Sequence, residues 1–151
     1  MANLMEILTL SKIRGVFNFC NKNSIDFRKV LENLLNEEPD FTVDDYRFIS
    51  VCEIDDIQVS ELKSDPYILG CFNADFLEGI TGLPSDIIKI VQEADEYEKL
   101  GDFLINRGFV NKIQENYVRY DTYGHHFSTY DSNTIEDLAD DDNVGYYVFR
   151  V

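Results

Sequence analysis

The hydrophobic pattern of the first third of the chain changes its period twice. Short alternating apolar runs in residues 5–21 are typical of two strands joined by a tight connection. Residues 24–38 then repeat apolar side chains at helical spacing, with Ser24 as a candidate N-cap. Residues 46–54 have the β-rich composition of a strand. The pattern predicts an N-terminal α+β lobe over residues 1–60.

The middle of the chain, residues 61–108, has a helical pattern. Asp75 can open a short helix, after which the sequence "TGLPSD" in residues 81–86 breaks the chain and caps a second helix. A third helix over residues 95–108 places its apolar side chains on one face and ends at Gly108. These helices predict a central helical lobe.

The C-terminal part, residues 109–151, returns to β character. The candidate strands are residues 116–123, 125–131 and 145–151, with a helical turn or an acidic loop over 134–143. The whole pattern predicts an α+β fold of two or three small lobes, with short antiparallel sheets and a helical centre.

Charge adds more to this picture than composition does. The 151 residues include 29 acidic and 13 basic side chains, a formal net charge of −16. Residues 1–35 hold five basic and three acidic side chains, a net of +2, so the rest of the chain carries −18. Such a field repels DNA, RNA and anionic membranes, and it attracts basic protein surfaces. A hydrophobic content of 44% indicates a folded chain rather than a disordered acidic tail.

The sequence contains neither a membrane span nor a recognisable leader. No run approaches the roughly 18 apolar residues of a transmembrane helix, and the first residues lack the basic start and the cleavage site of a signal peptide. We therefore expect a cytoplasmic protein of the host cell. Cys20, Cys52 and Cys71 are odd in number and lie among apolar neighbours, which favours buried free thiols over a disulfide or a metal site.

Two patterns resemble metal ligands, and both fail a test of spacing. Asp140 and Asp142 match the first positions of a calcium loop, but Val144 stands where an oxygen ligand is needed. His125 and His126 would point to opposite faces of a strand, so they could not share one ion. We expect no metal and no cofactor.

Catalytic motifs are also missing. The chain has no nucleophile elbow, no phosphate-binding loop and no cysteine with a histidine partner in its own segment. With 29 carboxylates, acidic pairs arise by chance and do not indicate a glycosidase. We expect no enzymatic activity.

The carboxylates occur in pairs and triplets, at the boundaries of expected elements and on solvent faces. Duplex DNA carries about one negative charge per 1.7 Å of axis, and enzymes that act on DNA line their channels with Lys and Arg. A rigid scaffold with carboxylates at a similar spacing can occupy such a channel. The candidate partner-binding residues, as phosphate mimics, are Glu37, Glu38, Asp40, Asp44, Asp45, Asp55, Asp56, Asp95, Glu96, Glu98, Asp121, Asp140, Asp141 and Asp142.

The aromatic stretch at residues 116–127 has the composition of a base-stacking surface. Because the surrounding charge repels nucleic acid, we interpret its tyrosines differently. Tyr117, Tyr120 and Tyr123 are expected to form the core of a small C-terminal lobe.

Four segments, in order, resemble the ArdA antirestriction family, which mobile elements and phages encode. They are "IDFRKVLENLL", "DYRFISVCEID", "ADEYEKLGDFLINRGF" and "NYVRYDTYGHHF". The last is the most specific, because the family carries "N-Y-I-D-Y-x-A-Y-G-R-D-L" there. The matching residues are Asn116, Tyr117, Tyr120, Tyr123 and Gly124, and His125-His126 stand where the family has Arg-Asp.

The resemblance implies a fold and a function. Family members are elongated, three-lobed α+β proteins that form homodimers and imitate bent duplex DNA. They occupy the DNA-binding groove of type I restriction-modification enzymes. By resemblance, we expect this chain to be a DNA-mimic antirestriction protein that binds the enzyme and not nucleic acid.

Two other functions stay open at this point. The same electrostatics could serve a phage or mobile-element inhibitor of another DNA-binding defence enzyme, such as a CRISPR effector nuclease. The charge could also belong to a plain acidic adaptor protein whose surface only aids solubility. Capture of partners from a bacterial lysate at low and at high salt separates the adaptor from the two inhibitors.

Overall fold

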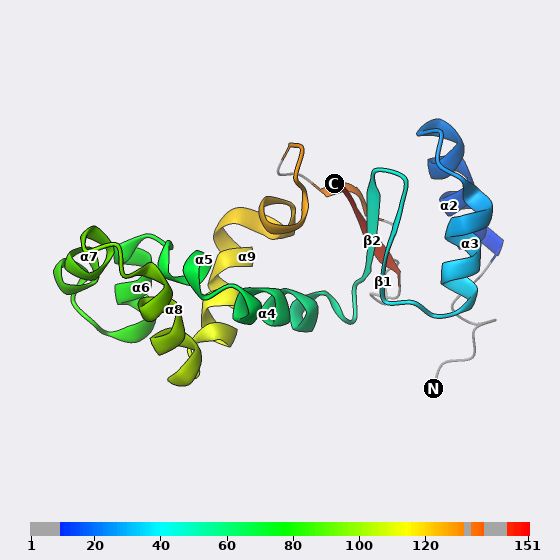
Figure 1. Cartoon of the computed structure of the whole chain (residues 1–151). Coiled ribbons are helices and arrows are strands. Elements are labelled where there is room, and N and C mark those ends of the chain that lie inside the picture. Colours follow the sequence, from blue (N-terminus) through cyan, green and yellow to red (C-terminus); the bar gives the residue numbers. More distant parts are fainter. Residues whose placement is uncertain (1–9, 132–133, 138–144) are drawn as a thin grey trace. The chain divides into compact units, whose positions relative to one another are not determined.

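The fold is α+β, in a computed structural model that describes residues 10–131, 134–137 and 145–151 (Figure 1). The chain divides into two compact units. Met1–Ile54 and Thr122–Val151 together form one, here called the sheet unit, and Asp55–Asp121 form the other, the helical unit.

The sequence pattern suggested three consecutive lobes, over 1–60, 61–108 and 109–151, whereas the contacts group the chain differently. Strand β4, near the C-terminus, pairs with β2 of the first lobe. This pairing returns the last part of the chain to the first part, so the sheet unit is discontinuous in sequence.

The sheet unit contains a four-stranded antiparallel sheet with the strand order β1-β2-β4-β3. The strands are β1 (Asp40–Val43), β2 (Tyr46–Ser50), β3 (Thr134–Asp137) and β4 (Tyr146–Arg150). The strand expected at residues 145–151 is confirmed as β4, and the one expected at residues 46–54 is confirmed as β2 over its first five residues, after which the chain turns and α4 begins at Ile54. The helical turn or acidic loop expected from residue 134 is wrong for β3, because these residues pair with β4.

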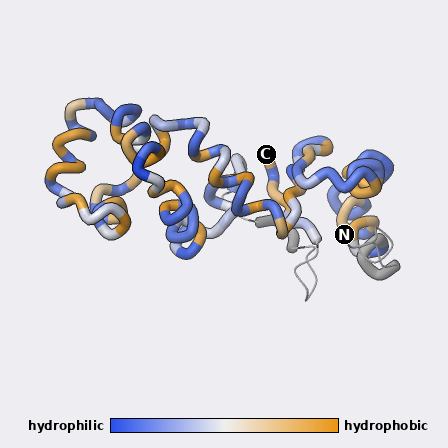
Figure 2. The backbone as a smooth tube through the Cα atoms, turned by 90° about the horizontal axis from the view of Figure 1, so that it is seen from below, coloured by the Kyte–Doolittle hydropathy of each residue, from blue (hydrophilic) through white to orange (hydrophobic). Residues whose placement is uncertain are grey.

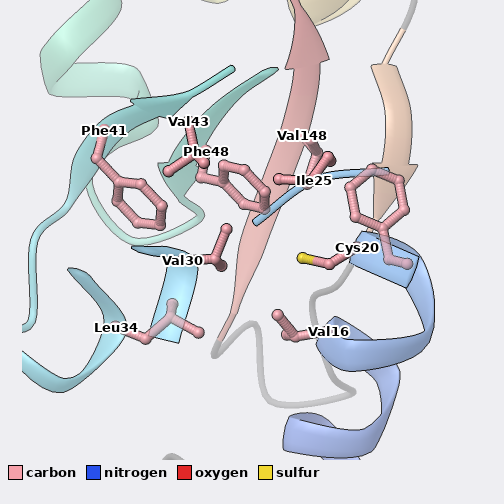
Figure 3. Packing of buried hydrophobic residues seen from close by; sticks show 10 residues of the cluster. Val16, Cys20, Ile25, Val30, Leu34, Phe41, Val43, Phe48 and Val148 are labelled. Atoms are coloured by element: carbon pink, nitrogen blue, oxygen red, sulfur yellow. The ribbon is translucent and has the colours of Figure 1, made fainter. Parts of the chain in front are cut away.

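Helices α2 (Leu10–Lys22) and α3 (Phe27–Leu35) supply the other half of this unit's core. Their apolar side chains pack with those of the sheet in one buried cluster, as Figure 3 shows. The labelled members are Val16, Cys20, Ile25, Val30, Leu34, Phe41, Val43, Phe48 and Val148. The cluster is therefore drawn from both ends of the sequence.

The two strands expected in residues 5–21 are wrong over the described part, where the chain forms α2. Its buried positions are Val16, Phe19 and Cys20, and this spacing is that of a helix face rather than of strand alternation. The β-rich composition of this segment does not produce strands, because tertiary contacts with the sheet and α3 override local propensity. Residues 5–9 lie outside the described residues.

Helix α3 confirms the helix predicted over residues 24–38, with a different cap. The side chain of Asp26, and not that of Ser24, accepts a hydrogen bond from the Arg28 N–H at 3.0 Å. Ser24 instead has a φ of 57° in the turn that precedes the helix. Val30 and Leu34 are buried, one turn apart, as the amphipathic pattern required.

The helical unit contains α4 (Ile54–Ser64), α5 (Pro66–Gly70), α6 (Ala74–Thr81), α7 (Ser85–Glu93), α8 (Tyr97–Asn106) and the first part of α9 (Val110–Phe127). The three helices predicted in the centre of the chain are confirmed as α6, α7 and α8. Gly108 follows α8 with a φ of 75°, and the Phe109 N–H bonds the Leu104 carbonyl at 3.0 Å. This is the glycine cap that the sequence predicted.

Helix α9 corrects the strands expected at residues 116–123 and 125–131. Ile113 and Tyr117 are buried one turn apart, and the Tyr117 ring meets the Phe72 ring edge-on at 5.1 Å. Thr122, with φ 62° and ψ 169°, interrupts the helix where the helical unit ends. Beyond it, Phe127 packs on Phe149 of β4 with ring centroids 5.3 Å apart.

Helices α5 and α8 approach each other at backbone distance. A Cβ atom added to Gly70 would lie 2.8 Å from the Tyr97 Cα and closer still to the Tyr97 carbonyl. A Cβ atom added to Gly101 would lie 2.7 Å from the Pro66 Cα. Glycine is required at both positions because any side chain would overlap the facing backbone.

Candidate functional site

The predicted partner-binding carboxylates lie on both units, and most of them face solvent. Figure 2 shows hydrophilic segments along both units, between the apolar stretches that form the cores. The exposed members of the set are Glu37, Glu38, Asp44, Asp45, Asp55, Asp56, Asp95, Glu98 and Asp121. Asp40 and Glu96 are partly buried, and Asp140, Asp141 and Asp142 lie outside the described residues.

The two partly buried carboxylates, Asp40 and Glu96, form ion pairs. Both oxygens of Asp40 accept from the Arg47 guanidinium, at 2.6 and 2.8 Å, and the guanidinium also lies 5.1 Å from the centre of the Phe127 ring. Glu96 meets Lys99 at 3.0 Å on the surface of α8. Asp40 therefore contributes to the packing of the sheet and presents less net charge than its exposed neighbours.

Several carboxylates have positions that the fold itself favours. Asp55 and Asp56 lie in the first turn of α4, and Glu98 lies in the first turn of α8. Negative charge is stabilising there because it meets the positive end of the helix dipole. Asp55 is also tied to the helical unit, since the Gln114 side-chain amide donates to its carboxylate at 2.7 Å and to the Gln58 oxygen at 2.9 Å.

Glu37 has a position that the fold disfavours. It follows the C-cap of α3 with a φ of 55°, and its N–H bonds the Leu34 carbonyl at 3.1 Å while the Glu38 N–H bonds the Asn33 carbonyl at 3.1 Å. These two bonds define a Schellman motif, whose left-handed residue is usually glycine. The carboxylate also lies at the negative end of the helix dipole, where a basic side chain would be stabilising.

The neighbouring residues hold this turn against the sheet. The Tyr146 hydroxyl of β4 donates to the Glu38 carbonyl at 2.8 Å. Burial, followed by the charges of Glu37 and Glu38, raises the pKa of Tyr146 to about 12. The raised pKa keeps the hydroxyl protonated, and therefore a donor, into the alkaline range in which an ordinary tyrosine ionises.

Asp95 and Asp44 share this backbone feature. Asp95 follows α7 with a φ of 59°, and the Glu96 N–H bonds the Val91 carbonyl at 3.2 Å in a second Schellman motif. Asp44 has a φ of 55° in the two-residue turn between β1 and β2. Aspartate tolerates the left-handed region better than glutamate does, so Glu37 is the most strained of the three.

We expect Glu37→Gly to raise the free energy of unfolding by about 1 kcal/mol, because it relieves a left-handed residue and removes a charge from the C-terminus of α3. The gain for Asp95→Gly should be smaller, a few tenths of a kcal/mol. Urea denaturation followed by circular dichroism measures both. The matched control is Glu32→Gly within α3, where glycine should lower stability. A loss of stability in Glu37→Gly would contradict the strain argument.

The prediction that Tyr117, Tyr120 and Tyr123 form the core of one C-terminal lobe is wrong, because Tyr117 belongs to the helical unit and Tyr123 to the sheet unit. Tyr117 is buried at 8% exposure, and burial, with a smaller effect of the Asp121 charge, raises its pKa to about 12. Tyr120 is 72% exposed, so the prediction that it belongs to a core is wrong. Tyr123 is half-buried and packs on Tyr147 with ring centroids 5.6 Å apart. Tyr117 and Tyr120 are three residues apart on the first part of α9, and the interruption at Thr122 puts Tyr123 on its second part, an arrangement that a strand assignment could not reveal.

The histidines and cysteines also differ from expectation. His125 and His126 lie on the second part of α9, so the strand argument for their orientation is wrong. Cys20 is buried, as expected, and burial raises its pKa to about 11, whereas Cys52 and Cys71 are exposed, so the prediction that they are buried is wrong. Within the described residues, no group of His, Cys, Asp or Glu could hold a metal ion, and no helix is long and apolar enough to cross a membrane.

The helical unit contains a cleft of about 450 Å³ that was not predicted from the sequence. It lies between α6 and α9, and the residues that line it are Asp75, Phe76, Gly79, Ile80, Lys112, Asn116 and Tyr120. Residues 112, 116 and 120 repeat at helical spacing, which is the signal that could have identified one wall. The strand assignment for residues 116–123 concealed it.

No protein-family model, no curated protein and no solved structure matches this chain.

Proposed function

We propose that this protein is a DNA mimic that occupies the DNA-binding groove of a defence enzyme in the host cytoplasm, with type I restriction-modification enzymes as the favoured target. The proposal draws on the family resemblance in the sequence and on the charge of the chain. It assigns no catalytic role to any residue.

Charge supports the proposal in both units. The helical unit alone holds 14 acidic against 6 basic side chains, a net of −8, and the sheet unit carries the other −8 of the chain's −16. A basic groove that steers DNA by its field would steer this chain in the same way. Phosphate backbones, in contrast, are repelled.

The observation that carries the proposal is the position of Glu37. An exposed carboxylate occupies a left-handed residue at the negative end of a helix, although glycine or a basic side chain would stabilise the fold there. Residues kept against the preference of the backbone often serve a function, at a cost in stability. A surface charge that only aided solubility could be placed anywhere else.

The direct test is the cleavage of unmodified DNA by a purified type I restriction enzyme. We expect this protein to inhibit cleavage. Excess DNA should restore cleavage because it displaces the inhibitor from the groove, and higher salt should weaken the inhibition because it screens the attraction between the charges. A mobility-shift assay without the enzyme should show no complex with duplex DNA at physiological salt. A direct DNA complex would contradict the mimic.

Parallel assays separate the alternative functions. Inhibition of a DNA-cleaving CRISPR effector, without inhibition of the type I enzyme, would move the target to another defence system. Inhibition of neither enzyme would leave the plain acidic adaptor. The Glu37→Gln variant, which keeps the side-chain length and removes the charge, is the matched control for the role of that carboxylate.

A further inference from the structure

The cleft of the helical unit is formed by two rows of side chains. Asp75 and Gly79 are one turn apart on α6, with Phe76 and Ile80 beside them. The facing row, on α9, runs through residues 112, 116 and 120. A Cβ atom at Gly79 would meet nothing within 4 Å, so this rim is open to solvent. A volume of about 450 Å³ is sufficient for a large side chain of another protein.

The cleft has hydrogen-bond acceptors that are available to a ligand. The Asp75 N–H bonds the Asn73 side chain at 2.9 Å, but nothing in the described part of the chain pairs with its carboxylate. The Asn116 side-chain amide donates to the Lys112 carbonyl at 2.8 Å, which leaves the amide oxygen as an acceptor. Acceptors therefore stand on both walls.

Two aromatic rings line the same cleft as these acceptors. The Tyr120 ring is 72% exposed and meets the half-buried Phe76 ring edge-on, with centroids 6.5 Å apart. Exposed aromatic faces attract cations, and a guanidinium group also stacks on them.

In the sheet unit, an arginine of the chain itself contacts both a carboxylate and an aromatic ring. Arg47 is held by both oxygens of Asp40 and lies over the Phe127 ring. The Arg150 guanidinium lies 3.9 Å from the centre of the Tyr130 ring. Arg47 thus contacts a carboxylate and a ring together, Arg150 contacts a ring, and the cleft presents a carboxylate and a ring to solvent.

We propose that the cleft binds an arginine side chain of the basic protein that this chain inhibits. The inference rests on the proposed function for the existence of such a partner. The guanidinium pairs with the Asp75 carboxylate, stacks on Tyr120 and donates to the Asn116 oxygen. Arginine is preferred over lysine because its planar, forked donors meet a carboxylate and a ring at the same time.

Replacement of Lys112 distinguishes a cationic from an anionic ligand of the cleft. Lys112 is exposed and lines the cleft, so its positive charge repels a cationic ligand and its neutralisation strengthens the binding of arginine. A ligand with an anionic group would bind more weakly after the same change. Lys112→Gln therefore reports the charge of the occupant.

The experiment titrates the ¹⁵N-labelled full chain with the peptide acetyl-Gly-Arg-Gly-amide and with its lysine counterpart. We expect the arginine peptide to shift the amide signals of Asp75, Phe76, Gly79 and Tyr120 and to bind more tightly than the lysine peptide. Asp75→Asn and Tyr120→Leu should each lower the affinity for the arginine peptide about fivefold. Lys112→Gln should raise the affinity for the arginine peptide about twofold.

Asp102→Asn, an identical charge change at an exposed site on α8 away from the cleft, is the matched control. Equal effects of Asp75→Asn and Asp102→Asn, equal affinity for the two peptides, or weaker binding by Lys112→Gln would each overturn the proposal. The amide spectra of the free variants show whether each is folded. Because no enzyme is present, peptide binding without nuclease inhibition would count against the proposed function alone, and inhibition without peptide binding against the cleft alone.

Discussion

Gly101→Ala is expected to lower the free energy of unfolding by about 3 kcal/mol or more, since the new methyl group would overlap the Pro66 backbone. Most overpacked sites relax by a change of rotamer, but here the neighbour is main chain, so α5 and α8 must move apart. Their separation would open the core around Leu69 and Leu104, which are both fully buried. Gly70→Ala should behave in the same way, because it meets the Tyr97 backbone.

The matched control for this prediction is Gly79→Ala on α6. A Cβ atom there meets nothing within 4 Å, and alanine is the better helix former by roughly 0.5–1 kcal/mol. We therefore expect Gly79→Ala to be neutral or stabilising in the same urea denaturation. Equal midpoints for Gly101→Ala and Gly79→Ala would show that α5 and α8 do not cross as closely as described.

The second large effect concerns inhibition. Simultaneous replacement by Asn of the aspartates at 44–45, 55–56 and 140–142 should weaken binding to the target enzyme about a thousandfold. Each exposed pair contributes roughly 0.2–1 kcal/mol, so seven lost contacts amount to about 4 kcal/mol. Asp141→Asn alone should change binding by fivefold or less. Inhibition titrations over a range of salt concentrations measure both the affinity and its salt slope, which should also fall.

Replacement of the same seven residues by Glu keeps the charge and serves as the control. Asp55 needs a further check because the Gln114 amide donates to it, so the stability of each variant must be measured beside its inhibition. If a single substitution abolished inhibition without loss of stability, the distributed recognition proposed here would be wrong.

The sequence alone determined those elements whose signals are local. Helices α3, α6, α7 and α8 follow from apolar spacing and from turn residues such as Gly108, because a helix is stabilised by contacts between residues three and four apart. Strands β2 and β4 follow from their β-branched and aromatic composition. The acidic character of the chain is a property of the sequence itself.

Tertiary structure decided the elements in which local preference and packing disagree. Residues 10–22 and 110–127 are rich in aromatic and β-branched side chains, yet both are helices because one face of each packs on a core. The division into units depends on the pairing of β2 with β4, which are far apart in the chain, and no local signal encodes such a pairing.

The candidate site divides in the same way. The sequence determined that carboxylates would be abundant and grouped, since charge and order along the chain are explicit in it. Only the tertiary structure decided that Asp40 is neutralised by Arg47 and that Glu37 is held in a left-handed turn. It alone placed Asp75 opposite Tyr120 across a cleft. These properties depend on distances between residues and on backbone angles, which are fixed when the elements pack against one another.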